Sequence, residues 1–267
     1  GINKEPGAWF GTLELPSVHA MIGARVDGQQ TVDQFYVGDL DEFQVFGMPL
    51  TSDEIAQSYD STRERPDVWN PFSHYKLNET EGTVVHDNGP EGYDATAGTD
   101  IENLAVPGRI GGAFQFNGVD VNNNVNLAEL GSAVGEDIQG SLAFWVKDVG
   151  KTLPAYSVFS VTNDSDKDHL EVFVGASRVR LEVWHSEGSQ LVLSESWTQA
   201  NVFASGWHHI AFIQTGIGLK LYVDGVEREL QSQASEIPGA WFNPLRGYFR
   251  AARLGQRIRY DLNTDFL

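Results

Sequence analysis

Leu219-Lys220-Leu221-Tyr222-Val223 runs directly into Asp224-Gly225. Apolar and polar residues alternate in this stretch, which predicts a half-buried strand, and Asp-Gly between strands is the strongest short signal for a hairpin turn. The apolar run at 208–213 comes just before it and is joined to it through Gly216 and Gly218. The stretch therefore predicts antiparallel strands connected by tight turns.

The same pattern continues upstream. Leu170–Val174 and Val179–Trp184 also alternate and are bounded by glycine, serine and aspartate. Short strands at a spacing of about 10 residues are typical of a β-sandwich. Helical signal is confined to Thr51–Tyr59, which offers an N-cap, early acidic residues, and Ile55 and Tyr59 four positions apart. We expect an all-β fold with one short helix.

Composition narrows the class of protein. The 267 residues carry a formal net charge of −19, are 41% hydrophobic and include no cysteine. This apolar content excludes a disordered chain. The negative charge argues against nucleic acid or an anionic membrane as partner and favours cations, Ca²⁺ above all. Without cysteine, disulfides, thiolate metal sites and cysteine nucleophiles are impossible. We expect a calcium-stabilised extracellular or cell-surface protein without membrane insertion.

One segment occurs twice. Pro6-Gly7-Ala8-Trp9-Phe10 recurs as Pro238-Gly239-Ala240-Trp241-Phe242, an offset of 232 residues, and Ile22–Arg25 matches Leu254–Arg257 at the same offset. Self-similarity at a long period indicates a repeat architecture. We expect the chain to be cut from a longer protein, with neighbouring modules among its partners. The two copies would then compete for one place in the fold.

Several motifs resemble those of laminin-G-like, concanavalin-A-like jelly-roll modules. They are Tyr75–Gly82 followed by Asp87, Gly111–Asp120, Ser141–Lys147, Gly206–Ala211 with Leu219–Val226, and Gly38–Tyr59. The resemblance implies an antiparallel jelly-roll β-sandwich and the mixed functions of this superfamily, which includes glycan-binding and adhesion modules and modules attached to enzymes.

The order of these motifs departs from that of the family, because the closing motif at 38–59 comes first. We therefore divide the chain into residues 1–59 (the displaced C-terminal strands and closing helix of such a unit), a linker at 60–74, and the main body at 75–267. The first and last strands are neighbours in this family. We expect residues 36–59 to complete the sheet that Tyr75 begins, within one chain or by strand exchange in a homo-oligomer.

The resemblance also implies a calcium site. It places Asp87 after the first strand, Asn117 and Gly118 in a turn, and Asp41 in the closing strand; Asp120 is a further candidate ligand. Ca²⁺ takes six to eight oxygen ligands, with carboxylates mixed with carbonyls. Asp41 alternates with apolar residues at 43 and 45, which predicts that it faces the packed side of its strand. The alternative is that these are turn residues bonded to nearby backbone.

Four residues are candidates for ligand binding. Trp184 and Trp197 flank a hairpin loop, where an indole face could stack on a sugar ring. Asp164 and Asp166 lie in an acidic loop. The alternative reading places both tryptophans in the core and the acidic loop at a solvated hairpin tip.

Catalytic signal is weak. Glu182 and Glu187 lie five positions apart, which puts them on opposite faces of a regular strand, whereas glycoside hydrolysis needs two carboxylates facing one bond. His208 and His209 likewise point to opposite faces, which favours packing over a shared metal. We expect no enzyme.

The sequence therefore predicts a non-catalytic, calcium-stabilised extracellular adhesin module that binds cell-surface glycan or protein. A structural spacer without ligand, and a polysaccharide hydrolase or its carbohydrate-binding module, are the alternatives.

Overall fold

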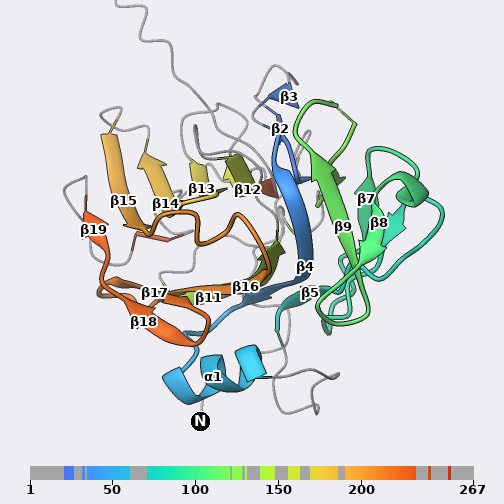
Figure 1. Cartoon of the computed structure of the whole chain (residues 1–267). Coiled ribbons are helices and arrows are strands. Elements are labelled where there is room, and N and C mark those ends of the chain that lie inside the picture. Colours follow the sequence, from blue (N-terminus) through green and yellow to red (C-terminus); the bar gives the residue numbers. More distant parts are fainter. Residues whose placement is uncertain are drawn as a thin grey trace, which may run out of the picture.

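The computed structural model describes residues 21–26, 32–33, 35–60, 71–120, 122–127, 130, 139–147, 156–162, 169–185, 190–232, 240–241 and 252–253. Two antiparallel sheets lie face to face and form a sandwich, with helix α1 (Ser52–Asp60) below the smaller sheet (Figure 1). The predicted fold class, an all-β jelly-roll sandwich with one short helix, is confirmed.

The larger sheet has ten strands. Along its main path the order is β19 (Gln231–Ser232), β15 (Gln190–Thr198), β14 (Arg178–His185), β13 (His169–Gly175), β12 (Tyr156–Thr162), β1 (Met21–Ile22), β10 (Val125–Asn126), β7 (Ala95–Ala97) and β6 (Val84–Val85). The tenth strand, β20 (Ala252–Arg253), pairs with β12.

The smaller sheet has eight strands. Its order is β18 (Val226–Arg228), β17 (Leu219–Val223), β16 (Trp207–Gln214), β11 (Gly140–Lys147), β4 (Val37–Phe46), β9 (Gly112–Asn117) and β8 (Ala105–Pro107), and β5 (Ser73–Tyr75) pairs with β4. Strands β2 (Arg25–Val26) and β3 (Val32–Asp33) pair with each other in a separate two-stranded antiparallel sheet. A 3₁₀ turn covers Ile101–Asn103.

The hairpin expected at Asp224-Gly225 is present between β17 and β18. Both turn residues have positive φ, 54° for Asp224 and 74° for Gly225, as a two-residue hairpin turn of the primed type requires. Both oxygens of the Asp224 carboxylate are used: His208 Nδ1 lies 2.8 Å from Oδ2, and the His209 amide donates to Oδ1. The turn therefore also fixes the start of β16.

The short helix expected at 51–59 is α1 (Ser52–Asp60). Thr51 and Glu54 form a capping box: the Glu54 amide donates to Thr51 Oγ1, and the Thr51 amide donates to a Glu54 carboxylate oxygen. The helix buries Ile55 in a small apolar cluster with residues of β11, β16 and β17, on the side of the eight-stranded sheet away from the main core. α1 therefore closes the outer face of that sheet.

Strand β4 completes the sheet within one chain. It lies between β11 on one side and β9 and β5 on the other, and Phe43 is opposite Tyr75. This is the pairing expected between the closing motif and the strand at Tyr75. Strand β5 begins at Ser73, so it starts inside the stretch that we expected to be linker.

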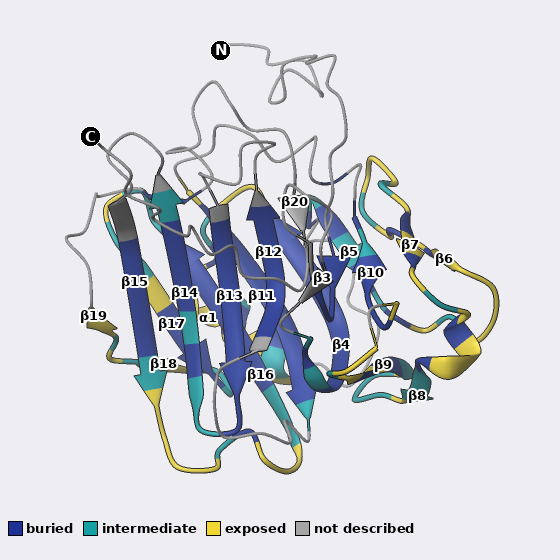
Figure 2. Ribbon diagram, turned by 90° about the horizontal axis from the view of Figure 1, so that it is seen from above, coloured by how far each residue is buried: buried dark blue, intermediate teal, exposed yellow. Residues whose placement is uncertain are grey.

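The main core lies between the two sheets. Phe43 packs against Phe144 of β11 and Phe159 of β12, with ring centroids 5.7 and 5.3 Å apart. Figure 2 shows that β4 and the strands β12–β14 are buried along much of their described length. The closing strand therefore contributes to the centre of the sandwich.

The expected direction of the Asp41 side chain is wrong. Glu42 has a φ of 52°, and the register of β4 on β11 shifts between Ala143 and Trp145. This bulge interrupts the alternation. Asp41 lies opposite Trp145 on the outer side of the sheet, whereas Phe43 faces the core. Asp41 is nevertheless fully buried.

Candidate ligand-binding face

Strands β13, β14 and β15 carry polar side chains on the side of the ten-stranded sheet away from the core. Leu170, Val172, Leu181 and Val183 belong to the core, so the residues between them face outward. The register aligns these in two rows across the strands: Glu171 with Glu182 and Ser194, and Phe173 with Arg180 and Ser196. We call these six residues the outer rows.

The outer rows form a connected network. Arg180 Nη1 lies 3.0 Å from Glu182 Oε1, and the Ser194 hydroxyl donates to the same oxygen over 3.2 Å. The Arg180 guanidinium also lies over the Phe173 ring, 4.3 Å from its centroid. Glu182 and Ser194 are 6% and 1% exposed. A charge this buried needs such partners, so the network holds Glu182 in a fixed position.

Glu171 lies directly opposite Glu182 in the register of β13 and β14. Side chains of directly opposite residues project from the same face, with Cβ atoms about 4.5–5.5 Å apart. The structure therefore brings Glu171 and Glu182 together on one face. Glu187, which the sequence analysis placed on the opposite face from Glu182, lies outside the described residues.

The two candidate tryptophans lie on opposite faces. Alternation along β14 puts Trp184 on the same face as Arg180 and Glu182, and its side chain is half-buried. Trp197 lies opposite Val179 and packs against the main core, near Phe203 and under the Arg228 guanidinium. Trp184 and Trp197 therefore cannot form one platform, and only Trp184 accompanies the outer rows.

The candidate ligand residues Asp164 and Asp166 lie outside the described residues. Their role stays a prediction.

Asp41 is the most distinctive of the candidate calcium ligands. Its Oδ2 accepts hydrogen bonds from the backbone amides of Arg109 and Ile110, at 2.7 and 2.9 Å, while no described group donates to the buried Oδ1. Burial raises the pKa of Asp41 to about 7; the charge of Glu42 adds to this, and the backbone hydrogen bonds oppose it. Through these two hydrogen bonds, the Asp41 carboxyl holds the β8–β9 turn against β4.

Asp87 has a complete set of partners. Its carboxylate accepts hydrogen bonds from the amides of His74, Gly89 and Tyr93, at 2.7 to 3.0 Å. These contacts fix the turn after β6 against β5. Such bonds to nearby backbone are what we expected if Asp87 is a turn residue rather than a calcium ligand.

Asn117, Gly118 and Asp120 form the turn after β9. Asn117 Oδ1 accepts from the amides of Val119 and Asp120, and Asp120 Oδ1 accepts from the Asn122 amide. Gly118 has a φ of 70°, which favours glycine. Asn117 lies opposite Val37, four residues from Asp41 along β4 and so about 13 Å away.

The structure thus spreads the five candidate ligands over three places. Within the described ranges, no three His, Asp or Glu side chains are arranged to hold a metal. The buried Asp41 Oδ1 would suit a cation, but the described residues around it do not supply the further carboxylate ligands that such a site needs. Calcium binding stays a prediction.

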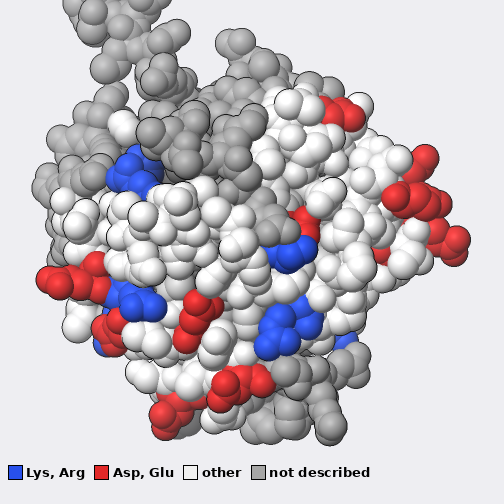
Figure 3. Space-filling model, in the orientation of Figure 1, with Lys and Arg blue, Asp and Glu red and all other residues white. Residues whose placement is uncertain are grey.

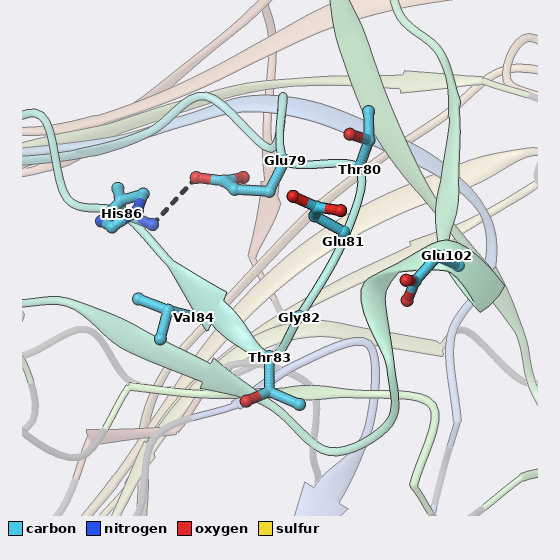
Figure 4. Close-up of a pocket in the computed structure, with 8 residues that line it drawn as sticks. All are labelled: Glu79, Thr80, Glu81, Gly82, Thr83, Val84, His86 and Glu102. Carbon is cyan, nitrogen blue, oxygen red and sulfur yellow. Dashed lines mark hydrogen bonds between the residues drawn. The ribbon is translucent and has the colours of Figure 1, made fainter.

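A separate hollow of about 580 Å³ lies beside β6 (Figure 4). It is lined by Glu79, Thr80, Glu81, Gly82, Thr83, Val84, His86 and Glu102. The His86 amide donates to Glu79 Oε1, and no aromatic ring other than the His86 imidazole lines the hollow. It therefore offers carboxylates and hydroxyls but no large stacking surface.

Sequence reasoning named Trp184 as a candidate, which stays a prediction, and missed most of the outer rows. The alternation of Arg180, Glu182 and Trp184 is visible in the sequence and was the signal that could have placed these three on one face of a strand. The partners Glu171, Phe173, Ser194 and Ser196 depend on the register of three strands. Nothing in the sequence of one strand reveals that register.

Comparison with known proteins agrees with the fold. A family model described as the concanavalin A-like lectin/glucanases superfamily matches residues 117–258. No curated protein and no solved structure gives a significant match. The matched residues include β11–β19, and so all of the outer rows.

Proposed function

Since the chain belongs to the concanavalin A-like lectin/glucanases superfamily, we propose that it is a non-catalytic binding module that recognises a glycan through Trp184 and Arg180, the two half-buried side chains of this face. The observation that carries this proposal is the juxtaposition of a half-buried indole with an ordered Arg180–Glu182–Ser194 network on one sheet face. An indole face stacks on the apolar side of a sugar ring. The partly exposed Arg180 guanidinium beside it, held by Glu182, is placed to donate hydrogen bonds to sugar hydroxyls.

The setting we propose is an extracellular adhesion protein. In the described residues, no helix has the length and apolar character needed to cross a membrane. Figure 3 shows acidic side chains spread over the visible face, with basic ones among them. The net charge of −19 suits a neutral or cationic ligand better than an anionic one. Calcium stabilisation is part of the proposal.

The test is a screen of the intact chain on a glycan array, repeated with Trp184→Ala. We expect binding to a restricted set of glycans, and loss of that binding in the variant. Ile217→Ala is the matched control, because Ile217 is 84% exposed at the tip of the β16–β17 hairpin. Folding of each variant is checked by its melting temperature. Absence of binding, or equal binding by a folded Trp184→Ala variant, contradicts the proposal.

A second candidate is a polysaccharide hydrolase, favoured by the placement of Glu171 opposite Glu182. Retaining glycosidases hold two carboxyl groups about 5–5.5 Å apart. Two observations argue against hydrolysis. Glu171 is fully buried, and Glu182 already forms an ion pair with Arg180. Release of reducing sugar that is lost in Glu182→Gln would favour hydrolysis over binding alone.

A further inference from the structure

Two strands from opposite ends of the chain pair with the same residue of β12. Met21 of β1 and Arg253 of β20 each lie opposite Ser160. The neighbouring pairs are Ile22 with Phe159 and Ala252 with Val161. Both strands are antiparallel to β12.

These two strands belong to the repeated segment. Met21 and Arg253 are equivalent positions, separated by 232 residues, the offset that also relates Pro6 to Pro238. The two copies therefore take the same register on β12. A shift of one residue would reverse which side chains face the core, so the shared register indicates that both copies are suited to one position.

That position must be filled for the ten-stranded sheet to be continuous. Strand β1 lies between β12 and β10, and its Met21 and Ile22 pair with Asn126 and Val125. Without a strand here, β12 and β10 would both present unpaired edges. Ser160 has one pair of backbone groups on this side, so two copies cannot pair with it fully at the same time.

The C-terminal copy is also held elsewhere in the fold. Trp241 is 1% exposed in the main core, and the Ala240 carbonyl accepts a hydrogen bond from Gln214 Nε2 over 2.9 Å. The N-terminal equivalents, Ala8 and Trp9, lie outside the described residues. In the described structure, the C-terminal copy contributes the buried tryptophan, the N-terminal copy lies between β12 and β10, and both copies pair with Ser160.

We propose that the strand position between β12 and β10 is an exchange site, which accepts the C-terminal copy of the repeated segment from a second copy of this chain. Among the described residues, β1 pairs with each neighbour through two residues, so its replacement breaks few of the described pairings. Each chain has one such position and two segments that suit it. The donated and receiving surfaces differ, so the association is heterologous and forms rings or open chains.

Disulfide trapping tests this proposal, because the natural chain has no cysteine. A Ser160→Cys chain is mixed with an Arg253→Cys chain and oxidised. Directly opposite residues in antiparallel strands have Cα atoms about 4.5–5.5 Å apart, within the range of a disulfide. We expect a mixed disulfide between the two chains. Adding Ile22→Ala to the Ser160→Cys chain should raise its yield several-fold, because this change loosens the resident β1.

Three controls make the result decisive. Ile217→Cys replaces Arg253→Cys in a parallel mixture and gives the yield of random collision. A chain with both Met21→Cys and Ser160→Cys reports occupation by its own N-terminal copy. A mixed disulfide no more abundant than the Ile217→Cys control overturns the proposal. A chain that carries both Ser160→Cys and Arg253→Cys separates the two arrangements, and a bond that forms only within that chain also overturns the proposal.

Light scattering of the unmodified chain gives a second readout that needs no cysteine. Exchange predicts an apparent mass that rises with concentration. Ala252→Pro removes a backbone donor from β20 and should lower that mass. Equal, concentration-independent masses for the two proteins contradict exchange.

Discussion

Phe43 lies directly opposite Tyr75, so the strand that closes the sandwich precedes the strand beside which it pairs. In the motif order of related modules, the equivalent of β4 comes last. Here α1 and residues 61–72 connect β4 to β5 instead. The same neighbours are thus joined in the reverse order, and the core between the sheets is complete within one chain.

The first prediction concerns this closing strand. Phe43→Ala should destabilise the fold by about 3–5 kcal/mol, because it leaves a cavity between Phe144 and Phe159. Urea unfolding measures the change. Met48→Ala is the control, since Met48 is 63% exposed just after β4, and it should cost little. Similar stabilities for both variants would mean that β4 does not form part of the core.

The second prediction concerns the helix cap. Thr51→Ala removes the hydroxyl that accepts from the Glu54 amide and should cost about 1 kcal/mol. The loss should appear as a lower melting temperature. Gln57→Ala, at an exposed position in the middle of α1, should leave stability unchanged or slightly raised. A loss in Gln57→Ala equal to that in Thr51→Ala would speak against the cap.

The third prediction is a pH dependence that arises from Asp41. The folded protein holds the Asp41 proton up to a pKa of about 7, against a usual value of 3.8. The folded state binds this proton more tightly than the unfolded chain, so its stabilising contribution is complete below pH 3.8 and is lost as the pH rises through 7. The contribution is at most about 4 kcal/mol.

Unfolding in chelator from pH 4 to 7.5 measures this contribution. Asp41→Asn imitates the protonated carboxyl, so its stability should exceed that of the natural protein increasingly as the pH rises. A constant difference between the two proteins across this range would show that Asp41 does not titrate there.

The fourth prediction concerns calcium. If the ion binds only the folded protein, a concentration 100 times its Kd adds about 2.7 kcal/mol of stability. Melting with excess Ca²⁺ and with EDTA should differ by several degrees. Asp41→Ala should lose most of this response, while Asp166→Ala should retain it. If the natural protein melts identically with excess Ca²⁺ and with EDTA, calcium does not stabilise the fold.

Local features of the fold were accessible from sequence. Hydrophobic alternation identified β13, β14 and β17, an apolar run identified β16, Asp224-Gly225 identified a turn, and the residues around Thr51 identified a helix start. Each of these depends on neighbours within a few positions. The closing strand also followed from the resemblance to a family whose first and last strands are adjacent.

Features that depend on register between strands were not accessible. The bulge at Glu42 reversed the expected direction of Asp41, because one residue in a positive-φ conformation breaks a period of two. Likewise, Glu171 meets Glu182 only through the β13–β14 register. Spacing along single strands therefore named Trp184 as a candidate but could not give its surroundings.

The central claim is that the face carrying Trp184 and the Arg180–Glu182 pair binds a glycan. Titration calorimetry with the strongest glycan from the array, on the natural protein and Trp184→Ala, tests it most directly. We predict at least a tenfold loss of affinity, about 1.4 kcal/mol, with unchanged melting temperature. Equal affinities for the two folded proteins would contradict the claim.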